Sequence, residues 1–155
     1  MSKHLCGAAT DLALRCIENF AQNAPERTKT ILIALCCHHR CDWNIYVGKD
    51  FLLSHNFKAE DFSLLCGLTS WATCGTGKPR ENSKVIKLES NPHTDRYERL
   101  NLPRETREEI GRRAKRLIDK GRCEFIQKQF KMSVKLKYYV DLSYTLENVV
   151  LIAQK

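Results

Sequence analysis

A run of cysteine and histidine residues, Cys36-Cys37-His38-His39-Arg40-Cys41-Asp42-Trp43, is the part of the sequence best suited to chemistry. Imidazole titrates near neutral pH and can take a proton from a substrate, while thiols and imidazoles both bind soft metal ions. The run follows a short apolar segment at Thr30–Leu35, which predicts a strand buried on both faces. Ligands of open α/β sheets bind outside the carboxyl ends of strands, so this position favours a functional site.

A zinc site with Cys36, Cys37 and Cys41 as ligands is the weaker alternative for the same run. Structural zinc sites usually use two pairs of ligands, each pair separated by about two to four residues. Here the candidate ligands are contiguous and no clean second pair follows. The sequence therefore predicts no metal site.

A helix is expected just before the strand, over residues 10–23, with Thr10 as its cap. Its apolar residues recur at helical spacing and consist of Ala9, Leu12, Ala13, Cys16, Ile17 and Phe20. Cysteines on a helix face and at a strand end suit reduced thiols rather than disulfides. Together with the lack of a secretion signal, this predicts an intracellular protein of the nucleus, the cytoplasm or both.

We expect a single domain over 1–155. It should contain a flexible insertion at about 76–101, where proline is frequent and apolar periodicity is weak. Before the insertion, the pattern indicates a helix at 46–55 and an extended stretch at 62–65. After it, Pro103 opens the clearest helix, which Gly121 is expected to end, and a second helix covers 122–129.

The last part of the chain changes to a period of two. Residues 134–140 predict a strand with one solvent-exposed face, at or near an edge of the sheet. Residues 148–153 are continuously apolar. A half-exposed strand joined by a hairpin to a buried one predicts that the last strand is inserted within the sheet, antiparallel to its neighbour. The sequence therefore predicts an α/β fold that ends in an antiparallel hairpin.

The net charge of +8 favours a polyanion such as RNA as partner. No segment approaches the roughly 20 apolar residues of a membrane span, so no membrane partner is expected. Basic residues gather around the clearest helix and comprise Arg112, Arg113, Lys115, Arg116, Lys120 and Arg122. They predict either a phosphate-binding surface or a solvated helix face with Glu–Arg pairs.

Besides the Cys36–Trp43 run, the chain contains six further distinctive motifs. They are Lys3-His4-Leu5-Cys6-Gly7-Ala8-Ala9-Thr10-Asp11-Leu12, Tyr46-Val47-Gly48-Lys49, Ser70-Trp71-Ala72-Thr73-Cys74-Gly75, Ile118-Asp119-Lys120-Gly121-Arg122, Tyr138-Tyr139-Val140-Asp141 and Leu146-Glu147-Asn148-Val149. Together these motifs resemble the eukaryotic tRNA ribose methyltransferases that act on nucleotide 4, and the resemblance is collinear along nearly the whole chain. The resemblance implies a Rossmann-like class I methyltransferase that uses S-adenosylmethionine to methylate a ribose 2′-hydroxyl of tRNA. Members of this family also carry an upstream half with a glycine-rich loop for the methyl donor.

No strand followed by such a glycine-rich turn occurs in the 155 residues. We therefore expect the C-terminal portion of the sheet, with activity only when the other half is present. A non-catalytic RNA-binding or interaction fragment is the alternative.

The resemblance, together with the position of the run, suggests roles for particular residues. His38 or His39 is expected near the target ribose as general base, and only one of the two should face the site, because successive residues of an extended chain point to opposite faces. Lys3 and His4 are expected to contact the donor or a phosphate and to assist catalysis. The expected cofactor contacts are Lys3, His4, Cys6 and Gly7, and the expected tRNA contacts are Arg40, Arg112, Arg116 and Lys120.

Overall fold

The computed structural model describes residues 6–23, 28–73 and 101–155. The elements in chain order are α1 (Gly7–Asn23), β1 (Thr30–Leu35), α2 (Lys49–Ser54), α3 (Ala59–Thr69), the short 3-10 helix η1 (Ser70–Ala72), α5 (Arg104–Phe130), β2 (Ser133–Tyr138) and β3 (Val149–Gln154). Lys3, His4 and nearly all of the expected insertion at 76–101 lie outside the described residues.

The described strands form one sheet of three strands in the order β1-β3-β2, and β3 runs antiparallel to both neighbours. Leu151 of β3 lies between Ile33 of β1 and Leu136 of β2. The last strand is therefore inserted between two earlier ones, which confirms the hairpin predicted from the change in period. The prediction that β2 lies at an edge of this sheet is also confirmed.

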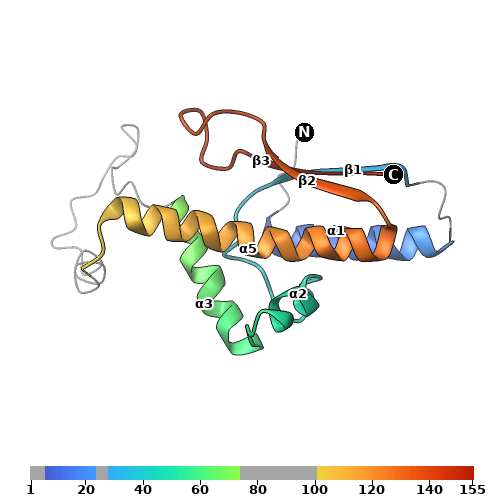
Figure 1. Cartoon of the computed structure of the whole chain (residues 1–155), viewed down its shortest axis with the longest axis horizontal. Helices are drawn as coiled ribbons and strands as arrows, with labels where there is room; N and C mark the ends of the chain where they lie inside the picture. Colours follow the sequence, from blue (N-terminus) through green and yellow to red (C-terminus); the bar gives the residue numbers. More distant parts are fainter. Residues whose placement is uncertain (1–5, 24–27, 74–100) are drawn as a thin grey trace, which may run out of the picture.

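The sheet packs on a layer formed by α1 and α5, and α2 and α3 lie on the opposite side of α5 (Figure 1). Between the sheet and this layer, the core contains the fully buried Leu14, Ile126 and Leu151. A second core lies between α5 and the α2–α3 segment, around Tyr46 and Phe62. Residues of α5 belong to both cores, so this helix joins the two halves of the described fold.

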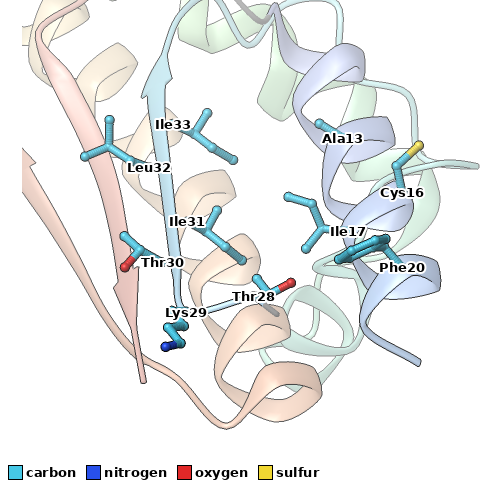
Figure 2. A pocket seen from close by; sticks show the side chains of 10 residues that line it. All are labelled: Ala13, Cys16, Ile17, Phe20, Thr28, Lys29, Thr30, Ile31, Leu32 and Ile33. Atoms are coloured by element: carbon cyan, nitrogen blue, oxygen red, sulfur yellow. The ribbon is translucent and has the colours of Figure 1, made fainter. Parts of the chain in front are cut away.

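The outer face of β1 is uncovered, so the prediction that this strand is buried on both faces was wrong. Burial alternates along the strand: Ile31 and Ile33 are buried, whereas Leu32 is 67% exposed. Ile31 and Ile33 point toward the α1 side and Leu32 points the other way (Figure 2). The reason is that the described helices cover only one face of the sheet.

An apolar groove runs between α1 and β1 (Figure 2). Part of the predicted apolar stripe of α1 lines this groove instead of entering the core, and Phe20 is 48% exposed. Leu14, which the predicted stripe did not include, is the apolar side chain of α1 that is buried completely. The helical period of α1 was thus predicted correctly, but the face that turns toward the described core was not.

One predicted extended stretch and two predicted helix boundaries were also wrong. The stretch 62–65 is helical within α3, because Phe62, Leu65, Cys66 and Thr69 recur at helical spacing and are buried. The first helix begins at Gly7, before its predicted cap Thr10. The helix predicted at 46–55 is the shorter α2.

The two helices predicted around Gly121 are the single helix α5. A Cβ at Gly121 would lie 2.2 Å from the Tyr46 hydroxyl, which donates to the Ile118 carbonyl at 2.8 Å. Glycine is therefore needed here for close packing and does not end the helix. The helix ends at Phe130, and Lys131 follows with φ of 54°.

Candidate functional site

Three of the motifs described above converge at one place, the junction between the start of α1, the loop after β1 and the middle of α5. Arg122 is at the centre and is 1% exposed. It donates to both carboxylate oxygens of Asp11, from Nε to Oδ1 at 3.1 Å and from Nη2 to Oδ2 at 2.7 Å. It also donates from Nη1 to Asp119 Oδ1 at 3.2 Å and from Nη2 to the Gly7 carbonyl at 3.0 Å.

The charges of this junction stabilise one another. Burial would lower the pKa of Arg122, but the hydrogen bonds and charge of Asp11, together with the charge of Asp119, raise it above its ordinary value. Burial would raise the pKa of Asp119, but the neighbouring His38 and Arg122 lower it below its ordinary value. The buried carboxylate of Asp119 is therefore ionised at neutral pH and can only accept hydrogen bonds.

His38 is the histidine of the run that enters this junction. It is 1% exposed, and its Nε2 lies 2.6 Å from Asp119 Oδ1. Because the carboxylate can only accept, Nε2 carries the hydrogen, and in the neutral ring Nδ1 keeps its lone pair. Nδ1 is buried and has no hydrogen-bond partner among the described residues. This nitrogen can accept a hydrogen bond from a group that does not belong to the described residues.

Gly7 is where α1 and the loop after β1 come closest. Its N–H donates to the Cys37 carbonyl at 2.8 Å, and a Cβ there would lie 2.7 Å from Cys41 Sγ. Since the Gly7 carbonyl accepts from Arg122, both backbone groups of Gly7 are used within the protein. Gly7 thus joins the two elements, and its N–H is used within the protein.

The cysteines of the site separate into two groups. Cys41 turns toward α5, where its Sγ lies 3.2 Å from Arg122 Nη2; the hydrogen bond with Cys66 and burial raise its pKa. The ligand set Cys36, Cys37 and Cys41 is therefore not brought together. Instead, the Sγ atoms of Cys36 and Cys37 lie with that of Cys6, all within 4.8 Å of one another. Burial and the neighbouring thiols of Cys6 and Cys36 raise the pKa of Cys37 to about 12.

The remaining predicted site residues lie at the surface or outside the described part. His39 and Arg40 are exposed in the loop after β1, so only one histidine of the pair enters the junction. Lys120 is exposed on α5.

The other predicted tRNA contacts on α5 are engaged in ion pairs. Arg112 pairs with Glu108 and Glu109, and Arg116 donates to Asp119 at 3.0 Å. Of the basic residues in this helix, Lys115 and Arg122 turn inward; Lys115 pairs with Glu147 of the loop between β2 and β3. The basic surface is therefore smaller than the count of charges in this helix suggested.

Sequence reasoning missed the roles of Asp11, Asp119 and Arg122 in this junction. The signal was present in the helical period: Lys115, Asp119 and Arg122 fall on the same face as the buried Ala114 and Ile118. Charged residues on a buried stripe predict internal ion pairs, because isolated buried charges are too costly.

Comparison with known protein families places the chain among the methyltransferases. The chain matches the family described as Methyltransferase TRM13 over residues 1–154. It belongs to this family. The resemblance stated from the motifs is thereby confirmed.

Curated relatives carry names that agree with the family. The chain is 34% identical over 207 residues to the mouse "tRNA:m(4)X modification enzyme TRM13 homolog", covering 99% of the chain and 43% of the relative. It is 33% identical over 174 residues to the Saccharomyces cerevisiae "tRNA:m(4)X modification enzyme TRM13", covering 100% of the chain and 36% of the relative. The chain thus spans less than half the length of these relatives. No solved structure matches it.

None of the helices in residues 6–23, 28–73 and 101–155 combines the length and apolar character needed to cross a lipid bilayer.

Proposed function

We propose that the chain belongs to the catalytic domain of an S-adenosylmethionine-dependent methyltransferase that modifies the ribose 2′-hydroxyl of nucleotide 4 in tRNA. Within that domain it forms the part that faces the tRNA, which accepts the methyl group. Its membership of the family and the printed names of its relatives support this function. The structural observation that carries it is the His38–Asp119 pair at the carboxyl end of β1. A tRNA substrate implies an intracellular protein, acting in the nucleus, the cytoplasm or both.

The chemistry requires removal of a proton from a ribose hydroxyl, which is a weak acid, while the methyl group is transferred. His38 is suited to this step because Asp119 holds Nε2–H and leaves the lone pair on Nδ1. Arg122 and Arg116 hold Asp119 in turn. Such a chain of contacts fixes the ring orientation, and correct placement of base and hydroxyl supplies much of the rate enhancement.

S-adenosylmethionine would supply the methyl group. Of the expected donor contacts, Gly7 is buried and its N–H donates to the Cys37 carbonyl, so its carbonyl oxygen, which has a second lone pair, is the group that could contact the donor. We propose that Lys3, His4 and the glycine-rich upstream half that the resemblance implies supply the rest of the donor site.

We also propose that the sheet is the end of a Rossmann-like class I sheet. The inserted antiparallel strand β3 supports this architecture. Among the described strands β1 has a neighbour on one side only, and its other edge, with the apolar groove beside the strand, would accept a further parallel strand of the larger sheet.

A segment exchange tests the proposed function. The matching segment of the Saccharomyces cerevisiae relative is replaced by this chain, and the hybrid enzyme is incubated with tRNA and methyl-labelled S-adenosylmethionine. The expected label lies in a nucleotide that resists alkaline hydrolysis, because a 2′-O-methyl group blocks cleavage of the adjacent phosphodiester bond. Label in a base would contradict the proposal. A hybrid that binds tRNA without methylating it, while the parent enzyme does both, would favour the RNA-binding alternative.

The tRNA surface gives a separate prediction. Arg40 and Lys120 are the exposed members of the predicted contacts, so Arg40→Glu with Lys120→Glu should weaken tRNA binding and reduce the salt dependence by about one unit of log–log slope per lost phosphate contact. The measurement is a titration of tRNA at several salt concentrations. Lys128→Glu, on the same helix and 62% exposed, is the control. Because the double variant reverses two charges and the control one, an effect of the double variant no more than twice that of the control would show that the response is only one of net charge.

A further inference from the structure

Three cysteine thiols from two elements meet at the start of α1. Cys6 directly precedes the helix, and Cys36 and Cys37 directly follow β1. Their Sγ atoms all lie within 4.8 Å of one another, and all three residues are partly exposed. The thiols are therefore close enough to share one ligand and open enough for that ligand to enter.

The backbone, and not the thiols themselves, brings these residues together. The Gly7 N–H donates to the Cys37 carbonyl at 2.8 Å, and the Ala9 N–H donates to the Cys6 carbonyl at 2.7 Å. Gly7 is buried, with no space for a Cβ beside Cys41. The thiol cluster is thus set by the same close approach that joins α1 to the loop carrying His38.

We propose that Cys6, Cys36 and Cys37 form a zinc site with one open coordination position. Zinc–sulfur bonds of about 2.3 Å in a tetrahedron place sulfur atoms about 3.8 Å apart, so small side-chain movements convert the observed cluster into a three-thiolate site. Sulfur ligands select zinc or copper(I) over magnesium and calcium.

A metal here would clamp the start of α1 to the end of β1. Those two elements carry Asp11 and the loop of His38, so the clamp would hold both sides of the buried junction. The fourth position would take water or another oxygen ligand from solvent. Metal binding does not depend on methyl transfer, and the two proposals can therefore fail separately.

Cobalt(II) and zinc titrations of the purified, reduced chain test the site. Cobalt should give thiolate charge-transfer bands and the intense visible bands of tetrahedral geometry, at one equivalent per chain, and zinc should displace it. Replacing Cys6, Cys36 or Cys37 by serine should lower the affinity roughly tenfold or more. The control is Cys16→Ser, since Cys16 is exposed on α1 outside the cluster. Absence of these bands, or an affinity unchanged in all three variants, would overturn the site.

A second measurement on the unmodified chain covers the case in which a serine variant fails to fold. Alkylation of each cysteine is followed by mass spectrometry with and without zinc. Zinc should slow the reaction of Cys6, Cys36 and Cys37 about tenfold or more and leave that of Cys16 unchanged. Equal rates with and without zinc at the three cysteines would refute the proposal.

Discussion

Replacing Arg122 by methionine should lower the free energy of unfolding of the chain by about 3–5 kcal/mol, the usual cost of removing one partner from a buried ion pair. The guanidinium neutralises Asp11 and Asp119, which are both completely buried, and makes the hydrogen bonds that join α1 to α5. Methionine fills similar space but leaves Asp11 without its cation and Asp119 with Arg116 alone as cationic partner. Chemical denaturation, monitored by circular dichroism, measures the loss.

Arg113→Met is the matched control, because Arg113 lies on the same helix, is 80% exposed and pairs with Glu109. An exposed pair of this kind contributes about 1 kcal/mol at most. If Arg122→Met were as mild as Arg113→Met, the junction would not hold the fold together as the contacts indicate.

His38→Asn should lower the rate constant of methyl transfer by about 10²–10⁴-fold, the usual contribution of a positioned general base. Asparagine keeps a polar side chain near Asp119 but cannot take the proton from the ribose hydroxyl. Binding of tRNA should change little, because His38 is buried and does not lie on the basic surface. Single-turnover methylation by the hybrid enzyme, with tRNA affinity measured beside it, separates the chemical step from binding.

His39→Asn is the control, since His39 is exposed and adjacent in sequence. It should change the rate constant by no more than a few-fold. The thermal midpoint of each variant shows whether a loss of rate reflects unfolding. A large loss with His39→Asn and none with His38→Asn would assign His38 a structural role and make His39 the base.

Much of the fold could be predicted because local patterns decide it. The apolar run at Thr30–Leu35 became β1 with the predicted bounds, and the alternation before the last apolar run predicted the inserted strand β3. The errors arose where a distant contact decides the outcome. Gly121 has the local character of a helix end, but the approach of Tyr46 and Gly48 requires glycine inside a continuous helix.

The site was predicted in part for the same reason. The Cys–His run and its position after a strand were visible in the sequence, whereas the partner of His38 was not, because Asp119 lies far along the chain. The thiol cluster shows this limit as well. Spacing within the run argued against a metal site, and only the fold brings Cys6 to Cys36 and Cys37.

The most direct test of the proposed function uses tRNA substrates that differ by one oxygen atom. The hybrid enzyme is given labelled S-adenosylmethionine and tRNA with 2′-deoxyribose either at nucleotide 4 or at a neighbouring nucleotide of the same strand. The proposed function predicts no methyl transfer to the first tRNA and full transfer to the second. Methyl transfer to the tRNA that lacks the 2′-hydroxyl at nucleotide 4 would contradict it.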